Sequence, residues 1–345
     1  MKWRFLKYLM AYSLPLAVFL SMQREGLLAY MPLFYAFLVV PLLELFFAPN
    51  PTNLDKQREE LIKEDPWYDR LLYLMVPIQL ALLLYFLWDL SHHTYDSLTF
   101  WGRISAMGLL CGVIGINVGH ELGHRRKKYE QVLAKILLST SLYVHFFTEH
   151  NYGHHRNVAT SEDPATARYK ENLYAFWLRS MVFSYLHAWK IQAQLLKSRK
   201  KSFWSPSNEL LLWSLIQLMG LAAIFLFFGL ESLLAFLAAA LIGALLLETV
   251  NYIEHYGLSR QKVSEHRYEK AEVEHSWNSD HIIGRLLLFE LSRHSDHHAH
   301  PHRKYQILQH HDQSPQLPTG YPGMMLLSTI PPLWFKVMNG RIKSA

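Results

Sequence analysis

The sequence predicts an all-α membrane protein, in which a six-transmembrane-helix bundle is joined to a cytoplasmic helical cap that carries a histidine-rich di-metal site. Three observations predict this fold. Hydrophobic residues make up 51% of the 345 residues and charged residues only 18%, whereas roughly a quarter of a soluble domain is charged. Six apolar runs are each long enough to cross a bilayer, which takes about 20 residues. Many of the 20 histidines gather in four clusters outside or at the ends of these runs.

The six predicted spans cover, in chain order, residues of about 5–22, 27–47, 71–90, 98–118, 209–228 and 233–253. The first run resembles a secretory signal, because basic residues precede it. No small-residue cleavage site follows it, however, and a second apolar run does, so we interpret it as an uncleaved anchor. We expect the two long segments of about 119–208 and 254–345 to be helical and cytoplasmic. The chain, 1–345, is therefore interpreted as a single membrane domain.

The distribution of lysine and arginine predicts the orientation of the bundle, because cytoplasmic loops are enriched in both. Basic residues lie at the N-terminus, after the second span and after the fourth span, where residues 125–128 are all basic. In the loops that would face the opposite side, Arg24 is the only lysine or arginine. Six spans with both termini in the cytoplasm satisfy every loop.

The histidine clusters have the spacing of residues that share a helix face. In chain order they read His120-Glu-Leu-Gly-His124, Glu149-His150-Asn-Tyr-Gly-His154-His155, Glu254-His255-Tyr-Gly and Arg293-His294-Ser-Asp-His297-His298. Spacings of three and four residues place side chains on one side of a helix. Three clusters can therefore each direct two or three imidazoles to one point, and the remaining cluster adds one more. With all four on one side of the membrane, the pattern predicts a metal centre.

The residues alone leave the metal open. The first cluster matches the His-Glu-x-x-His pattern of zinc proteases, but a catalytic zinc takes three protein ligands, far fewer than the nine candidates. Two metal ions fit this number better, and imidazole-rich sites suit iron, copper, nickel or zinc. The single cysteine, Cys111, excludes an intrachain disulfide and any site built from cysteines.

Acidic residues accompany the histidines, and those next to them are Glu121, Glu149, Glu254 and Asp296. We interpret them mainly as acceptors for the second N–H of a ligating imidazole, which fixes the orientation of the ring. Direct ligation and ordinary ion pairs are the alternatives. Glu248 and Asn251 precede His255 at helical spacing, and polar groups at that depth normally face the interior of a bundle. Asp163 fits either a supporting carboxylate or a helix cap.

At these residues the chain resembles the membrane-bound non-haem di-iron alkane monooxygenase (alkane 1-hydroxylase) family. The four histidine motifs carry the resemblance, and the segments Asp163-Pro-Ala-Thr-Ala-Arg168 and Leu317-Pro-Thr-Gly-Tyr-Pro-Gly323 add to it. The likeness extends from about residue 25 to residue 340. The His-Tyr-Gly element and the Glu-His-x-x-Gly-His-His spacing distinguish the chain from desaturases and sterol hydroxylases.

The resemblance implies two non-haem iron ions with O2 as co-substrate and n-alkanes hydroxylated to primary alcohols. It implies nine ligands: His120, His124, His150, His154, His155, His255, His294, His297 and His298. It also implies a location in the bacterial inner membrane, surrounded by lipid, and electrons from rubredoxin, which a flavin NAD(P)H reductase reduces. Nothing points to nucleic acid. We expect the other histidines of the tail, His300, His302, His310 and His311, to lie on the surface.

Basic side chains on the cytoplasmic side are candidates for docking the electron donor, and they are Arg125, Arg126, Lys127, Lys128, Arg303 and Lys304. Complementary charge would speed encounter with an acidic carrier. The alternative is that these residues only orient the bundle and contact lipid headgroups.

Other functions fit the same histidine pattern. The chain could be a related membrane oxidase, either a xylene or fatty-acyl hydroxylase or a desaturase. Each of these enzymes forms a different product from an alkane hydroxylase. A membrane zinc protease would bind one zinc ion, and a metal transporter would place ionisable residues near mid-membrane.

Overall fold

The computed structural model describes residues 3–265 and 267–342, and almost all of its regular structure is helical. The strands within those residues are β1 (Lys262–Ser264) and β2 (Arg267–Tyr268), which pair as a short antiparallel hairpin. The predicted helical class is therefore confirmed.

Four helical stretches of the described chain are long and apolar enough to cross a membrane: Gly26–Phe46, α5 (Pro66–His92), Ser97–Gly123 and α12 (Glu209–His255). They contain the second to sixth predicted spans. The predicted first span is helical in two pieces, η1 (Arg4–Tyr12) and α1 (Ser13–Ser21). Two of the long stretches are built from shorter elements. The stretch Gly26–Phe46 consists of η2 (Gly26–Tyr30), α2 (Met31–Phe34), η3 (Tyr35–Val39) and α3 (Val40–Phe46). The stretch Ser97–Gly123 consists of α6 (Ser97–Leu110), η4 (Cys111–Ile116) and α7 (Asn117–Gly123).

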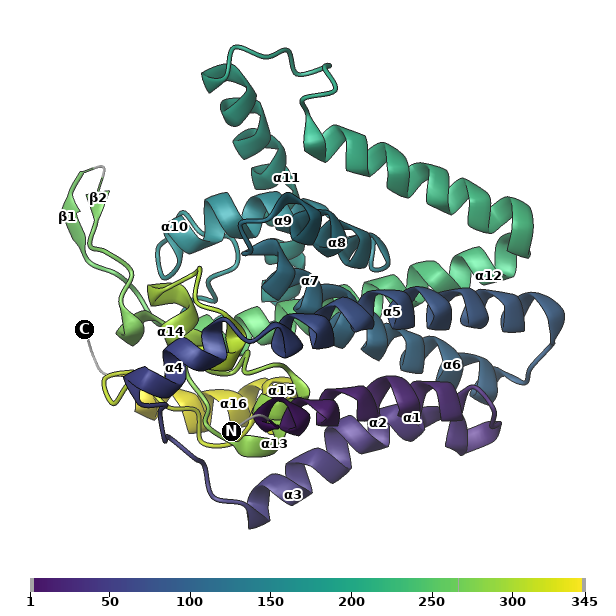
Figure 1. The fold of residues 1–345 in the computed structure, drawn as a ribbon, viewed down its shortest axis with the longest axis horizontal. Helices are drawn as coiled ribbons and strands as arrows, with labels where there is room; N and C mark the ends of the chain where they lie inside the picture. The colour runs from purple at the N-terminus through teal and green to yellow at the C-terminus, as the bar shows by residue number, and fades with distance from the viewer. Residues whose placement is uncertain (1–2, 266, 343–345) are drawn as a thin grey trace. The chain divides into compact units, whose positions relative to one another are not determined.

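The fourth stretch, α12, is 47 residues long and contains a break at Gly229, where φ is 83° and ψ is 176°. Glycine adopts this conformation readily because it has no Cβ. Figure 1 shows the chain turning back at this bend, so that α12 consists of two rods. One bilayer crossing uses about 20 residues, so α12 has the length of two crossings.

The chain divides into two compact units, and the first comprises Met1–Leu38, Pro66–Thr148 and His187–Leu247. It contains most residues of the long apolar stretches, together with α8 (Lys128–Ser139). Close helix contacts depend on small residues: a Cβ at Gly108 would lie 2.6 Å from the Cβ of Ile242, and one at Gly243 would lie 2.7 Å from the Cβ of Cys111. Small residues allow helices in a bilayer to approach closely.

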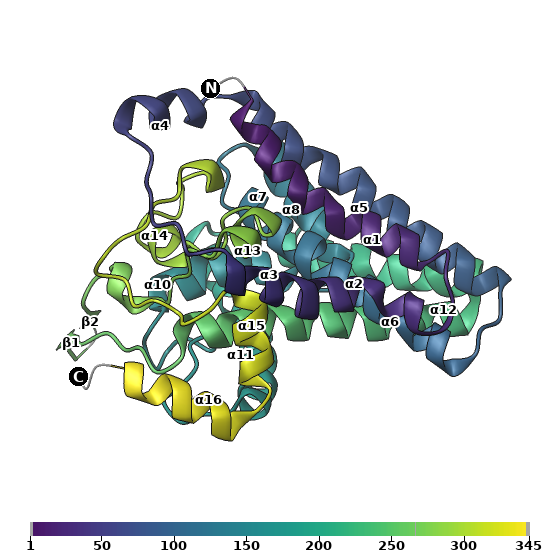
Figure 2. The ribbon, with the colours of Figure 1, turned by 90° about the horizontal axis from the view of Figure 1, so that it is seen from below.

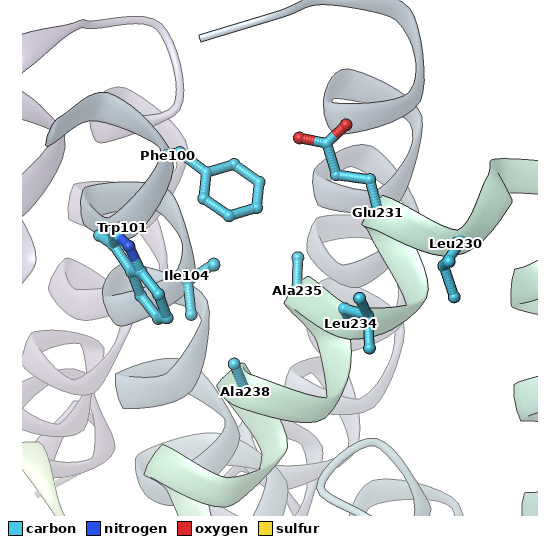
Figure 3. Close-up of a pocket in the computed structure, with 8 residues that line it drawn as sticks. All are labelled: Phe100, Trp101, Ile104, Leu230, Glu231, Leu234, Ala235 and Ala238. Carbon is cyan, nitrogen blue, oxygen red and sulfur yellow. The ribbon is translucent and has the colours of Figure 1, made fainter. Parts of the chain in front are cut away.

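A pocket of about 540 Å³ lies in this unit between α6 and α12. Figure 3 shows its mostly apolar lining, with the carboxylate of Glu231 on the α12 side. Phe100, which lines it, precedes His120 by twenty residues along one helical stretch, which corresponds to about 30 Å at 1.5 Å per residue. The pocket is therefore remote from the histidines of that stretch.

A buried ion pair also lies in this unit. The guanidinium of Arg103 is 2.8 Å from the Asp89 carboxylate, donates to the carbonyl of Met22 and stacks on the ring of Tyr95. Arg103 is 3% exposed and Asp89 4%.

We expect Asp89→Ala to lower the free energy of unfolding by about 3–5 kcal/mol, because removal of one partner leaves the other charge buried and uncompensated. Unfolding of the detergent-solubilised protein by denaturant measures this loss. Glu60→Ala is the control, since Glu60 forms only an exposed pair with Lys63 and such pairs contribute about 0–1 kcal/mol. Equal effects of the two substitutions would contradict the assignment.

The second unit comprises Val39–Asp65, Glu149–Leu186 and Glu248–Ala345. Its elements are short and are joined by irregular segments, apart from the shared helix α11 (Leu173–Ser198). They include α4 (Lys56–Lys63), η5 (His150–His154), α10 (His155–Asn157), η6 (Val273–His275), α13 (Ile282–Leu287), α14 (His294–Ala299), η7 (Tyr305–Ile307), α15 (Tyr321–Ser328), α16 (Pro331–Met338) and η8 (Asn339–Arg341). Figure 2 shows α15 and α16 in yellow, meeting at an angle. The short α9 (His145–Glu149) ends at the boundary.

Candidate metal centre

Three of the four histidine clusters lie in the second unit, each at a helix terminus or in a distorted turn. His255 is the last residue of α12, and His294 is the first residue of α14. The π-helical turn η5 begins at His150 and ends at His154, and it continues into α10 at His155. Single π-turns are frequent at functional sites, because they shift the direction of side chains relative to a regular helix.

Four buried histidines form the first group, and they are His154, His255, His294 and His298. Their ligand nitrogens lie within 4.8 Å of one another. Nε2 of His294 is 3.2 Å from Nε2 of His255 and 2.9 Å from Nε2 of His298. A single imidazole proton on His294 cannot satisfy both contacts. Metal–imidazole bonds of about 2.0–2.1 Å place two ligand nitrogens at right angles about 3 Å apart, so the spacing fits a shared metal ion.

Asp163 orients one member of this group. Its Oδ2 is 2.9 Å from Nδ1 of His154 and accepts from the hydroxyl of Thr166, while its Oδ1 accepts from the N–H of Ala165. Burial alone would raise the pKa of Asp163, but the charge and the hydrogen bond of His154, with the bond from Thr166, hold it below its ordinary value. Nε2 of His154 is buried and has no hydrogen-bond partner within the described chain. A proton held on Nδ1 leaves Nε2 as the ligand atom, which fits metal binding.

The imidazole of His255 also has a partner at its second ring nitrogen. Nδ1 of His255 is 3.4 Å from the hydroxyl of Ser276. Glu254, beside it on α12, accepts a hydrogen bond of 2.7 Å from the hydroxyl of Tyr321, and its other oxygen is 3.2 Å from Nε2 of His294. Sequence reasoning did not identify Ser276 or Tyr321 as site residues, although Tyr321 lies in the segment Leu317-Pro-Thr-Gly-Tyr-Pro-Gly323 that adds to the family resemblance.

Three further histidines gather in the second unit. Nε2 of His155 is 3.0 Å from Nε2 of His150. The ring of His297 is centred 4.9 Å from that of His155 and 6.2 Å from that of His150. The spacing of His150 and His155 again corresponds to two ligands of one ion.

The remaining predicted ligands lie in the first unit, His120 within α7 and His124 directly after its last residue. His120 and His124 are buried, and their Nε2 atoms are 3.1 Å apart. Glu121, between them, accepts from Arg125 at 2.7 Å, and Arg125 also pairs with Asp69 at 3.3 Å. Glu121 and Arg125 thus form a buried ion pair.

Comparisons with known proteins indicate the family of the chain. A family model described as fatty acid desaturase matches residues 96–327. The alkane 1-monooxygenase of Pseudomonas putida is 40% identical over 307 residues, which cover 88% of this chain and 75% of that protein. Alkane 1-monooxygenase 1 of Alcanivorax borkumensis is 40% identical over 304 residues, with coverages of 88% and 75%.

This chain belongs to the alkane 1-monooxygenase family. A more distant relative is the xylene/toluene monooxygenase hydroxylase component of Pseudomonas putida, which is 28% identical over 281 residues, or 80% of this chain and 74% of that protein. These relatives are named monooxygenases, and monooxygenases are oxidoreductases.

Among the other predicted carboxylates, Asp296 has contacts outside the nine histidines. It accepts from Arg303 at 2.7 Å and lies 2.7 Å from Nε2 of His311. Burial would raise the pKa of Asp296, but these two partners keep it below its ordinary value. Arg303 is consequently occupied by an internal ion pair.

The expectation of a surface location holds only in part for two tail histidines, which are half-buried. The side chains of His310 and His311 are 15% and 24% exposed and contact Asp280 and Asp296. His300 and His302 are exposed, as expected. His310 and His311 contact aspartates that are distant in sequence. Such tertiary contacts cannot be predicted from the spacing of the histidines.

The last predicted residues fall into buried and exposed sets. Glu248 and Asn251 are buried, with the amide of Asn251 donating to Glu248 at 3.4 Å, and Glu149 is 2% exposed. Arg126, Lys127 and Lys128 are exposed, and Lys304 is half-buried.

Proposed function

We propose that this protein is an alkane 1-monooxygenase, which uses O2 to hydroxylate the terminal carbon of n-alkanes to primary alcohols. The observation that carries the proposal is the buried group of four histidines, with Asp163 directing Nε2 of His154, in a chain 40% identical to alkane 1-monooxygenases. Its tests are product formation and metal content.

We propose that all nine predicted histidines hold two non-haem iron ions. One ion would bind the group of four around His294. His150, His155 and His297 of the second unit would bind the other ion. His120 and His124, whose 3.1 Å nitrogen spacing is that of two ligands, are the remaining two of the nine. When bound, iron supplies the activation of O2 and the cleavage of a strong C–H bond, which no side chain provides.

The chain's own residues would perform the remaining tasks. Asp163 and Ser276 hold the imidazoles of His154 and His255 in one tautomer and orientation. Burial of the ligands excludes water, which would compete for an oxidising centre. Apolar spans allow a hydrocarbon to reach the site from lipid, and a narrow path would present its chain end first, so that positioning selects the terminal carbon.

The proposed topology has six crossings, both termini and the site on the cytoplasmic side of the bacterial inner membrane, and residues 1–345 as one hydroxylase domain. The break at Gly229 supports two crossings within α12. The helical N-terminal residues Arg4–Ser21 would supply the first crossing.

Rubredoxin, reduced by a flavin NAD(P)H reductase, is the proposed electron donor, and the exposed run Arg126, Lys127 and Lys128 is its proposed docking site. Arg125 and Arg303 contribute less directly, because both are engaged in internal ion pairs.

Turnover at limiting rubredoxin is expected to fall about tenfold or more as salt approaches about 1 M, where the Debye length is about 3 Å. The physical reason is that complementary charges accelerate encounter only while they are unscreened. Stopped-flow reduction or steady-state assays measure the effect. At saturating rubredoxin the rate should change little, and a flat response at limiting rubredoxin would refute electrostatic docking.

The function itself is tested in cells that supply rubredoxin and its reductase. We expect octane to be converted to 1-octanol. Alkenes from fatty-acyl substrates would favour the desaturase alternative, and oxidation of xylene without oxidation of octane would favour the aryl-methyl hydroxylase. A single zinc ion with peptidase activity would favour the protease.

A further inference from the structure

Arg260, in the segment that follows α12, binds the main chain of the turn formed by residues 156–159. Its Nε donates to the carbonyl of Val158 at 2.7 Å, and its Nη2 donates to the carbonyl of Arg156 at 2.7 Å. Its own backbone N–H donates to the carbonyl of Ala159, also at 2.7 Å. Three hydrogen bonds from one residue therefore join this turn to the segment after α12.

The turn directly follows two predicted ligands, His154 and His155. His154 belongs to the group of four histidines, and His155 lies with the other group, 3.0 Å from His150 between their Nε2 atoms. In the proposed centre these two neighbours in the sequence therefore bind different ions. A shift of the backbone at this turn would displace one ligand of each ion.

The end of α10 explains why the turn needs a cationic partner. The last carbonyls of a helix have no partner within it, and a positive side chain there is favourable. The helix ends at Asn157, whose carbonyl accepts from the N–H of Thr160 at 3.1 Å. The guanidinium of Arg260 binds the carbonyls on either side of it. Val158 is 0% exposed, so its carbonyl would be left unsatisfied if the guanidinium were removed.

The guanidinium of Arg260 is engaged by main-chain oxygens rather than by a carboxylate. Its third side-chain hydrogen bond in the described part of the chain goes to the carbonyl of Glu269, at 3.0 Å. Arg179 also binds carbonyls in this unit, but it pairs with Glu171 as well. The planar fork of arginine offers five N–H donors, whereas lysine has a single nitrogen. Lysine therefore cannot reproduce these three bonds.

The turn is also connected to the side chain that orients His154. Ala159 has a φ of 57°, a left-handed conformation that is unfavourable for a residue with a Cβ. Its carbonyl accepts from Arg260, and its N–H donates to the hydroxyl of Thr166 at 2.9 Å. That hydroxyl donates to Asp163, which holds Nδ1 of His154. Arg260 thus supports the backbone after the ligands and the hydrogen bonds that orient one of them.

We propose that Arg260 is a positioning residue of the metal centre, which fixes the turn that carries one ligand of each ion. This inference rests on the proposed function, because it takes His154 and His155 as ligands of two ions. It distinguishes Arg260 from Asp163, whose contact with the ligands is through His154. Loss of Arg260 should disturb both ions, whereas loss of the Asp163 carboxylate should disturb one.

The test compares the full-length wild type, Arg260→Ala and Arg341→Ala in detergent. Arg341 is the matched control, because it is an exposed arginine of the same unit whose Nη1 donates to the carbonyl of Val337. For each protein we would measure metal per chain, the rate of metal removal by a chelator, and the Mössbauer spectrum. In Arg260→Ala both ions should leave about 10–100-fold faster, since loss of an outer partner of a ligand costs that much in affinity. Both wild-type doublets should change, and Arg341→Ala should match the wild type.

Three further measurements separate positioning from charge and from a general loss of stability. Arg260→Lys keeps the charge without the fork, so metal release should remain about 10-fold faster than in the wild type. Asp163→Asn should alter one doublet. Added guanidinium ion should slow the release of metal from Arg260→Ala, because it can occupy the half-buried site, and it should have no such effect on Arg341→Ala.

Wild-type release rates and an unchanged spectrum in Arg260→Ala would overturn the inference, and so would a change confined to one doublet. If that variant does not fold, Arg260→Lys decides by the same two measurements, and wild-type behaviour would refute the role of the fork. A wild type that contains zinc would defeat the proposed function, but the release of that zinc from Arg260→Ala would still test Arg260. A wild type that binds no metal would overturn both.

Discussion

Replacement of His298 by alanine is expected to lower octane hydroxylation by more than about 100-fold and to reduce the iron content from two ions per chain towards one. His298 is 4% exposed, and its Nε2 lies 2.9 Å from Nε2 of His294. Loss of a partner that merely orients a ligand costs about 10–100-fold, so loss of a ligand should cost more. Product chromatography and elemental analysis of the same preparation measure the two effects.

His302→Ala is the matched control for this substitution. His302 lies four residues further along the chain and is exposed, so its replacement should leave both iron content and turnover at wild-type values. A His298→Ala protein that keeps two irons and more than half of its activity would show that His298 is not a ligand.

Asp163→Asn is expected to lower turnover and iron affinity by about 10–100-fold. The carboxylate holds Nδ1 of His154 at 2.9 Å and lies within the unit that contains the whole group of four. An amide of the same size cannot stabilise the protonated Nδ1 as an anion does, so the ring would lose its fixed tautomer. Iron release to a chelator and kcat with octane measure the loss.

The control for Asp163 is Asp312→Asn. The side chain of Asp312 is 98% exposed, and its ion pair within the described residues is with His310, so this variant should behave as the wild type. Equal and small effects of the two substitutions would assign Asp163 the structural role of a cap, through its bonds to Ala165 and Thr166.

The helices were predictable because hydropathy and chain length directly reflect the cost of placing polar groups in lipid. The break in α12 was predicted at residues 229–232, and the structure places the non-helical conformation at Gly229. Composition alone does not separate one continuous helix of 47 residues from two shorter helices joined by a turn. The conformation of Gly229 is therefore needed to divide α12 into two rods. The division into two units was also not apparent, because α11 and α12 each contribute to both.

At the site, the grouping of histidines followed from their helical spacing, which is a local property. The pair of Glu121 with Arg125 has the same local origin, at a spacing of four residues. The partners of the other carboxylates depend on how distant segments fold together, as the contact between Asp296 and His311 illustrates. Tyr321 carried a signal only as part of the family-like segment 317–323. The contacts of Ser276 with His255 and of Tyr321 with Glu254 required coordinates.

The most direct measurement is turnover of octane by the purified protein, with rubredoxin and its reductase, under O2 enriched in the heavy isotope. The account predicts 1-octanol that carries one labelled oxygen atom per molecule, formed in proportion to the bound iron. An unlabelled alcohol, an alkene product, or turnover that is independent of iron would contradict it.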